Sequence, residues 1–586
     1  MAEQSIQPQA EAPTKTFKRK KKCAFFTDCE GNLDYFEKYV SMSKIIQFDL
    51  SGALDFYDLD TIFVYGGDSQ DKGIGDIRFV KMLLAFKKRY PSRVEFIIGN
   101  RDGNKIRLCS ELNIDLSDEK ILNDKEWQYW VERSKRVTPQ EFLTKNNLEN
   151  TWPNRLKWLL KETMGAEGAF ERRKMELAII RGQKTEDITD DEVVQSYRDE
   201  CDPMKPNDNF MLQYLQKAKV AFRFGSTIFV HGGINPKNIG TVPGKENADT
   251  SATVWISELN EWAQQELRDF TSDPRNPEKG KGLTNYGSSE DGNHGATVTY
   301  SNYLQNGNAQ HIPKEVQTFM LRNKISGVVS GHQPHGDCPV VICTGRANVI
   351  TADTSYSEMN SESGYGYQDN RGKKCVTEVI VNRDGTYEVH GFLQDGREIE
   401  YKVGGVNADP FVGRQLKNDE RWIKAKYKDE DKYLAVKGEG FKLTKFDMTG
   451  EELRTYTDKH FTQPDIPFRE ILKLYRINRP SLEEMGPRTD KSQPKPTSGD
   501  IVEEYWCDTL IRQQSFLTDA PDGKTDYIVK NTPIPIPDEI LNGKWKFVKT
   551  NEFFAWKQIG EWGIYHENWL NIMMSELFAR LRQLVE

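Results

Sequence analysis

Two carboxylates, Asp28 and Glu30, stand one residue apart directly after the apolar run 23–27, and a glycine follows them. Carboxylates this close repel each other unless a positive charge lies between them. A divalent metal ion is one such charge, and carboxylate oxygens are ligands for it. The stretch therefore raises the question whether other metal-capable side chains occur in matching places along the chain.

Five further apolar runs have the length of strands: 61–65, 94–98, 227–230, 327–329 and 349–351. Each is followed by small residues and by an acidic, amide or imidazole side chain. Turn chemistry accounts for any one such ending, because Asp, Asn and Gly favour turns. In layered α/β folds, however, the carboxyl ends of strands meet where sites assemble. The side chains concerned are Asp68, Asp71, Asn100, His231, His332, His335 and Asp353.

These side chains can be divided into two ligand sets. Asp28, Glu30 and Asp68 would supply the first set, and Asp68 would bridge to the second. Two cations about 3.5 to 4 Å apart can clamp a phosphoryl group and activate a bridging water. The second set would be Asn100, His231 and His332.

The order of the motifs resembles the calcineurin-like metallophosphoesterase superfamily, and within it the phosphoprotein-phosphatase branch of Ser/Thr phosphatases. That family reads GDxHG, GDxxDRG, GNHE, HGG and GH, where this chain reads TDCEGN, GGDSQDKG, GNRD, HGG and GHQPHG. The resemblance covers roughly residues 22–400. It implies an α/β (α+β) fold, a four-layer β-sandwich flanked by helices, and hydrolysis of phosphomonoesters by water activated at a dinuclear metal centre.

By this resemblance, Asp28 and Glu30 match first-metal ligands and Asp68 matches the bridging ligand. Asp71 matches the residue that orients a catalytic histidine. The second-metal ligands would be Asn100, His231 and His332, and His335 is a further candidate ligand.

Three positions depart from the family pattern. Glu30 in place of histidine favours Mn²⁺ or Mg²⁺, with Fe and Zn²⁺ as alternatives. Lys72 replaces a phosphate-binding arginine, so a point charge stands where a bidentate fork would be. Arg101 replaces the catalytic histidine, and since arginine stays protonated it cannot act as a general acid. Arg101 could still stabilise phosphoryl charge, and we expect it to pair with Asp71 when no substrate is bound.

Two classes of function remain open. The first is a metal-dependent phosphatase acting on phosphoserine or phosphothreonine, with a small phosphate ester or a nucleotide-type pyrophosphate as the alternative substrate. The GNRD motif favours the pyrophosphate. The second is a pseudophosphatase scaffold that keeps the metal site with weak or no turnover, which the residues at 72 and 101 favour.

The chain length allows several units. We expect a disordered basic tail over 1–21, the metallophosphoesterase domain over 22–400, and a mostly helical insertion in it at about 104–222. A small β-rich module over 405–480, a linker over 481–500 and a helical segment over 501–586 would follow. That last segment carries an apolar stripe from about Glu567, and the C-terminal module could bind a protein partner.

Composition restricts the partners and the compartment. A net charge of −8 over 586 residues gives no overall nucleic-acid footprint, and no apolar run approaches membrane-spanning length. Eight scattered cysteines without a CxxC pair are typical of reduced thiols. We therefore expect a cytoplasmic protein, with the nucleus as the alternative because of the basic run 18–22.

Overall fold

The computed structural model describes residues 21–124, 131, 133–246, 251–288, 295–344, 347–354, 356–357, 375–405, 407–457 and 460–462. It also describes the backbone of six strands between 501 and 563. Three expectations lie wholly or almost wholly outside these residues: the basic tail, the linker over 481–500 and the apolar stripe from Glu567.

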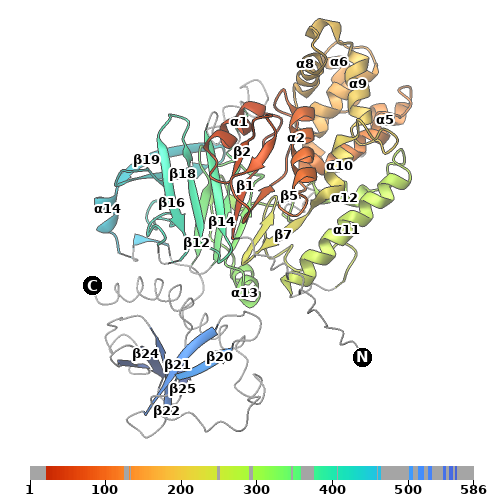
Figure 1. Cartoon of the computed structure of the whole chain (residues 1–586). Helices are drawn as coiled ribbons and strands as arrows, with labels where there is room; N and C mark the ends of the chain where they lie inside the picture. Colours follow the sequence, from red (N-terminus) through yellow and green to blue (C-terminus); the bar gives the residue numbers. More distant parts are fainter. Residues whose placement is uncertain are drawn as a thin grey trace, which may run out of the picture.

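Two sheets form the centre of the molecule (Figure 1). One has seven strands in the order β16-β15-β14-β1-β4-β5-β6, and the other has five in the order β12-β13-β11-β8-β7. In the first sheet β1, β4, β5 and β6 run parallel, and the hairpin partners β14 to β16 run antiparallel. The bounds of the first sheet are β1 Lys22–Phe26, β4 Thr61–Tyr65, β5 Val94–Ile97, β6 Ala218–Lys219, β14 Val376–Asn382, β15 Tyr387–Phe392 and β16 Glu398–Val403. Those of the second are β7 Ala221–Phe224, β8 Thr227–Val230, β11 Gly327–Ser330, β12 Val340–Thr344 and β13 Ala347–Thr351.

Strand β1 shows how the layers form, because both of its faces are buried. Phe25 packs in the core that the two sheets share, with its ring centroid 5.6 Å from that of Phe229 on β8. Phe26 points the other way, onto Tyr39 of helix α1 (Leu33–Met42), at 4.4 Å between centroids. Side chains alternate across a strand, so a strand buried on both faces is apolar throughout.

Helices cover the outer faces of both sheets. α1 and α2 (Asp76–Arg89) share a hydrophobic core with the seven-stranded sheet, and α11 (Ala252–Ser272) and α13 (Lys314–Arg322) contact the five-stranded one. The order helix, sheet, sheet, helix confirms the expected four-layer sandwich. No helix among the described residues is both long and apolar enough to cross a bilayer.

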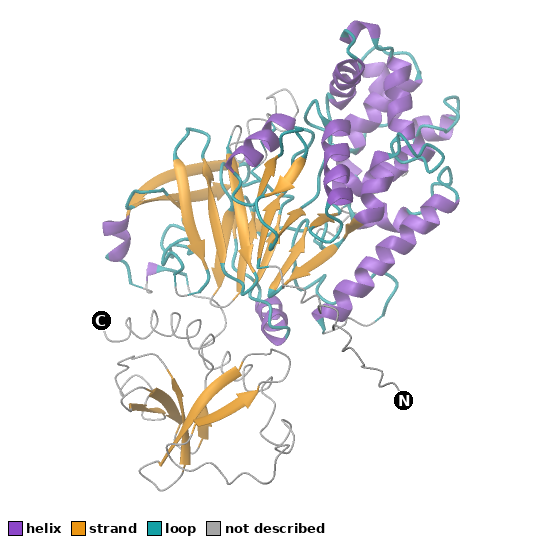
Figure 2. Cartoon of the chain, viewed as in Figure 1, coloured by secondary structure: helices purple, strands orange, loops and turns teal. Residues whose placement is uncertain are grey.

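Between β5 and β6 the described chain consists of helices and the loops that join them, with no strand, where a helical insertion was expected. Figure 2 shows these helices gathered on one side of the sheets. The longer ones are α6 Pro139–Lys145, α7 Trp152–Trp158, α8 Ala169–Arg181, α9 Asp190–Asp199 and α10 Phe210–Lys217. Three short ones precede them, α3 Asn100–Gly103, α4 Leu108–Glu111 and α5 Glu119–Asn123.

A third, three-stranded sheet follows the sandwich. Its strands are β17 Trp422–Lys426, β18 Lys432–Glu439 and β19 Lys442–Thr449, and α14 (Gly450–Arg454) follows them. Ile423 and Val436 of this sheet belong to the same buried cluster as Val341 of the sandwich. The β-rich module expected over 405–480 therefore shares its core with the main domain.

The described part of 501–563 consists of strands. They form a six-stranded sheet: β20 Ile501–Tyr505, β21 Arg512–Asp519, β22 Thr525–Lys530, β23 Trp545–Lys549, β24 Phe553–Gln558 and β25 Glu561–Gly563. This corrects the helical segment expected over 501–586, for the part that is described. The expectation followed a helical stripe near the C-terminus, whereas β-branched and aromatic residues upstream, as in β24, favour strands.

Candidate active site

The strand ends converge as the sequence pattern predicts. Each of the five core ligand candidates comes within three residues of the carboxyl end of a strand in the two facing sheets. Asp28 follows β1, Asp68 follows β4, Asn100 begins α3 after β5, His231 follows β8, and His332 follows β11.

Four of these side chains form a compact group that we call the metal cradle: Asp68, Asn100, His231 and His332. The Asn100 Oδ1 atom lies 3.1 Å from Nε2 of His231 and 2.9 Å from Nδ1 of His332. Asp68 Oδ1 lies 3.3 Å from the same Nε2 atom. Within the described chain, Asp68, His231 and His332 are the one trio of His, Cys, Asp or Glu whose ligand atoms all lie within 4.8 Å of one another.

The backbone at the cradle adopts a left-handed conformation that non-glycine residues rarely take. The φ angle is +51° at Asp28, +55° at Asp68 and +73° at His332. Such conformations cost of order 1 to 3 kcal/mol each and cluster at functional sites. Gly67, at φ +98°, lets the loop after β4 lie close to the loop after β5, because a Cβ atom at Gly67 would lie 2.6 Å from the Gly99 nitrogen.

Hydrogen bonds outside the cradle hold its side chains in orientation. Nδ1 of His231 donates to the Gly66 carbonyl oxygen at 2.8 Å, so Nε2 faces Asp68 and Asn100. The buried Asp102 carboxylate accepts from the backbone N–H groups of Asp68 and Gly99 at 3.0 and 2.8 Å. It thereby joins the loops that follow β4 and β5, and such support fixes metal-ligand geometry.

The charges of the cradle are strongly coupled. Burial acts to raise the pKa of Asp68, but His231, Arg101 and His332 outweigh it and hold that pKa below its usual range. Burial acts to lower the pKa of His231, whereas Asp68 and then Asp28 raise it to about 10. Burial and the neighbouring His231 lower the pKa of His332 to about 3, which leaves that imidazole neutral.

Glu30 makes ion pairs with side chains of the chain itself. Its Oε1 atom lies 2.6 Å from Nζ of Lys72 and 3.3 Å from Nε of Arg101. We call Lys72 and Arg101 the cation pair. The structure thus places two fixed positive charges against the carboxylate that was expected to bind the first metal. These two cations supply positive charge beside one of the two carboxylates that the sequence places close together.

Asp28 lies at the edge of the cradle. Its carboxylate accepts a hydrogen bond from the His332 backbone N–H at 3.1 Å and another from the Thr27 hydroxyl at 2.5 Å. Burial and the nearby Asp353 raise its pKa well above the usual range. Among the described residues, neither Asp28 nor Glu30 belongs to a trio of ligand atoms like that of the cradle. The cradle therefore fits one of the two expected ions, and an ion held by Asp28 and Glu30 stays a prediction.

The predicted contact between Arg101 and Asp71 is confirmed, at 3.2 Å between Nη1 and Oδ2. Nε of Arg101 also lies 3.5 Å from Asp68 Oδ2, so the guanidinium borders the cradle directly. Burial acts to lower the pKa of Arg101, but Glu30, Asp71 and Asp68 outweigh it and keep the group protonated.

Sequence reasoning missed Lys105 and Arg172, which also hold Asp71. The buried Lys105 Nζ lies 2.5 Å from Asp71 Oδ1, and Arg172 on α8 donates to the Asp71 carbonyl oxygen at 2.7 Å. Lys105 lies four residues after Arg101, a spacing that puts both on one face of a helical turn, and this signal was available. The contact with Arg172 spans 101 residues and carries no local signal.

His335 lies away from the cradle, which corrects its assignment as a candidate ligand. It is buried, and its carbonyl oxygen accepts a hydrogen bond from Lys424 on β17. Burial and the Lys424 ammonium lower the pKa of His335 to about 3. Positive φ angles at His332 and Gly336 turn this loop, so two histidines three residues apart reach different surroundings.

The donors of the cradle fit a divalent metal ion. One carboxylate oxygen, one amide oxygen and two imidazole nitrogens converge, and in neutral imidazole one nitrogen carries a lone pair for the ion. Coordination requires deprotonated ligands, so a cation bound between Asp68 and His231 would displace the proton that His231 holds there.

No family model matches the chain, and no curated protein matches it. Several solved structures are similar to it, among them the following two. One is a protein serine/threonine phosphatase from Saccharomyces cerevisiae with similarity to human phosphatase PP5, at 11% identity and a TM-score of 0.26, covering 62% of this chain and 74% of that one. The other is a metallophosphoesterase from Sphaerobacter thermophilus, at 12% identity and a TM-score of 0.22, covering 62% and 84%. At TM-scores of this size neither likeness carries weight for the function.

Proposed function

We propose that this chain is a metal-dependent phosphoester hydrolase. The supporting observation is the adjacency of the metal cradle and the cation pair, with Arg101 Nε 3.5 Å from Asp68 Oδ2. A phosphoryl group carries several negatively charged oxygens, and fixed cations beside a metal ion are the groups that stabilise it in transfer reactions.

The side chains of the cation pair have distinct tasks in this proposal. Arg101 presents a planar fork that can hold two phosphoryl oxygens, while Lys72 adds a point charge. Both are held by Glu30, so an incoming phosphoryl group exchanges with that carboxylate for the same donors. Asp71 holds the guanidinium of Arg101 in place, and Lys105 in turn holds Asp71. Because the guanidinium is already positioned, little reorganisation of the site is needed during the reaction.

A divalent ion in the cradle would polarise a phosphoryl oxygen and lower the pKa of a bound water. We propose Mn²⁺ as the ion, since the mixed oxygen and nitrogen donors suit it, with Mg²⁺, Fe and Zn²⁺ as alternatives to be tested in a panel. The ion pairs of Glu30 favour one ion per chain over the two that the motif order suggests.

The ion pairs of Glu30 also favour a second candidate function, a scaffold that binds phosphate without turnover. In that case Lys72 and Arg101 would stay bound to Glu30 and hold a phosphorylated ligand at most weakly. Catalysis and scaffolding differ in one measurable respect, which is hydrolysis that depends on an added metal ion.

The test is hydrolysis of p-nitrophenyl phosphate by the full chain with each of the four metals. We expect turnover with at least one metal, and a loss of at least about a thousandfold for Asp68→Asn and for His231→Ala. Asp429→Asn and His460→Ala, both at exposed positions, are matched controls that should keep full activity. Absence of turnover with every metal, in protein that retains its circular-dichroism spectrum, would favour the scaffold.

A further inference from the structure

A cavity of about 510 Å³ opens against the cradle, and His332 forms part of its wall. The loop after β8, the segment 300–304 and residues 310–313 enclose the other sides. This volume lies in the range of ligand sites for small organic molecules. A group attached to a phosphate at the cradle would therefore have space to extend into this cavity.

Among the described residues that line the cavity, none carries a fixed charge. None of its thirteen lining residues is Asp, Glu, Lys or Arg, although these types make up 29% of the chain. The lining combines amide, hydroxyl and aromatic side chains with the apolar residues Ile234, Leu304 and Pro313. The Tyr300 ring lies 4.8 Å from the ring of His332, which extends an aromatic surface from the cradle into the cavity. Such a wall suits an uncharged, flat ligand with several hydrogen-bonding groups.

Two lining side chains are available for such a ligand. Within the described chain, the side-chain amides of Gln310 and Gln333 make no hydrogen bond, and each offers both a donor and an acceptor. Asn235, by contrast, already donates to the Gly295 carbonyl oxygen at 2.7 Å and helps to build the wall. Paired amide donors and acceptors are the groups that read the edge of a nucleobase.

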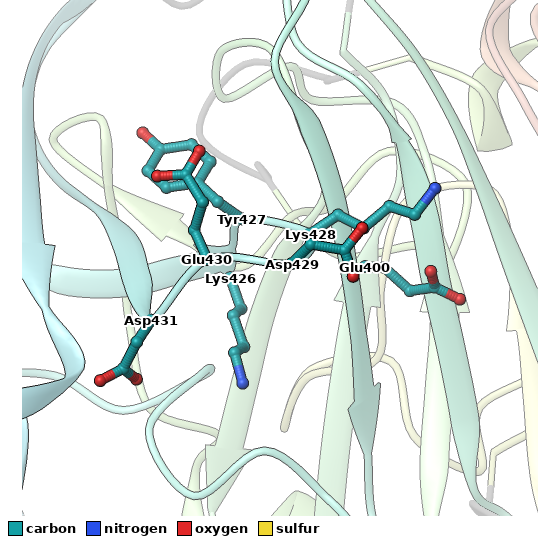
Figure 3. A pocket seen from close by; sticks show the side chains of 7 residues that line it. All are labelled: Glu400, Lys426, Tyr427, Lys428, Asp429, Glu430 and Asp431. Carbon is teal, nitrogen blue, oxygen red and sulfur yellow. The ribbon is translucent and has the colours of Figure 1, made fainter.

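A second hollow, around the turn between β17 and β18, offers a contrast. It is lined by Glu400 and by residues 426–431, and Figure 3 shows their side chains spread around the turn without converging on one point. Several of its charges are already paired, as Lys428 is with Glu398 at 2.6 Å. It offers no comparable set of available groups.

We infer that the cavity beside His332 binds the uncharged organic part of the substrate, and that this part is a nucleoside. This inference rests on the proposed function, since it identifies the leaving group of the phosphate ester that the proposed hydrolase would cleave. In the reaction, water would attack phosphorus and the phosphorus–oxygen ester bond of a nucleoside monophosphate would break. The products are inorganic phosphate and the nucleoside, which keeps the ester oxygen as a hydroxyl group. A phosphopeptide is the competing class, and it is an outcome of the test.

The experiment compares kcat/KM of the metal-loaded full chain for adenosine monophosphate, glycerol phosphate and a phosphoserine peptide. We expect adenosine monophosphate to exceed both others at least tenfold. Gln310→Glu, which puts a charge into the neutral wall, should lower its kcat/KM at least tenfold. The matched control is Gln305→Glu on β9 (Leu304–Gln305), an exposed glutamine outside the cavity, with an expected change under twofold.

A binding measurement separates failure of this inference from failure of the proposed function. Adenosine alone, followed by ligand-observed NMR, should bind the wild-type chain saturably and bind Gln310→Glu at least tenfold more weakly. Hydrolysis of glycerol phosphate with no preference for adenosine monophosphate, or a preference for the phosphopeptide, would overturn the nucleoside site and leave the hydrolase standing. Adenosine binding without any metal-dependent turnover would overturn the proposed hydrolase and leave the nucleoside site standing.

Discussion

Nη1 of Arg101 lies 3.2 Å from Oδ2 of Asp71, a carboxylate that is fully buried. This contact holds the guanidinium at the rim of the metal cradle, where most of its charge is shielded from water. In the family that the motifs resemble, a histidine stands at this position. In the proposed hydrolase, Arg101 would therefore stabilise phosphoryl charge and would not transfer a proton.

Arg101→Ala should lower kcat/KM for p-nitrophenyl phosphate by about a hundredfold or more, because one preorganised donor to the phosphoryl group is lost. Arg101→Lys should recover only part of this, since an ammonium cannot form the bidentate contact. Steady-state kinetics with saturating metal measures both. Arg89→Ala, an arginine on the partly exposed end of α2, serves as the control. Wild-type kcat/KM in Arg101→Ala would remove Arg101 from the catalytic site.

Lys105→Met should destabilise the fold by about 3 kcal/mol, because it removes a partner from a buried carboxylate. Both side chains of the Lys105–Asp71 pair are fully buried. Chemical denaturation of wild type and variant measures the difference. The exposed pair of Lys428 and Glu398 provides the control, and Lys428→Met should cost less than about 1 kcal/mol. An equal effect of the two variants would show that burial of the Lys105 pair is irrelevant to stability.

Gly67→Ala should cost at least about 2 kcal/mol more than Gly52→Ala. Both glycines have positive φ, +98° and +79°, so both substitutions carry the penalty of a left-handed backbone. At Gly52 a Cβ atom would meet nothing within 4 Å, whereas at Gly67 it would lie 2.6 Å from the Gly99 nitrogen. Thermal unfolding of the two variants isolates the steric part. Equal shifts in Tm would mean that the two loops do not approach as closely as described.

His335 should make the stability of the fold depend on pH. Its folded-state pKa is about 3, below the usual value of 6.5, because of burial and Lys424. Between these values the unfolded chain binds more protons, so stability is fully present above about pH 6.5 and declines as the pH falls toward 3. The loss from this one group is up to about 1.4 kcal/mol per pH unit.

The measurement is the Tm of wild type and of His335→Gln between pH 8 and pH 4. The variant should lose Tm less steeply below pH 6.5, while His460→Gln, at an exposed position, should follow the wild-type curve. Parallel curves for wild type and His335→Gln would contradict a neutral, buried His335.

The strand ends were predictable because a short apolar run followed by small and polar residues is a local signal. Asp68, Asn100, His231 and His332 could be assigned to one edge without any structure, since the carboxyl ends of layered strands converge. α8, Ala169–Arg181, was predictable for a similar reason, because it begins and ends at glycines and its composition is that of a helix.

The features that sequence reasoning did not predict depend on contacts between segments that are distant in the chain. Carboxylate spacing and motif order predict Glu30 as a metal ligand, which stays a prediction, but neither reveals the two cations that it contacts, from the loop after β4 and from α3. His335 was misassigned because spacing does not reveal which way a loop turns. The strands between 501 and 563 were missed because an apolar stripe further along outweighed their own composition.

Anomalous scattering from crystals of the full chain soaked in Mn²⁺ tests the central claim most directly. A single strong peak is predicted between Asp68 Oδ1, Asn100 Oδ1, His231 Nε2 and His332 Nδ1, with Lys72 and Arg101 still bound to Glu30. No peak among these four atoms, or a peak elsewhere in the chain alone, would contradict the metal site and with it the proposed hydrolase.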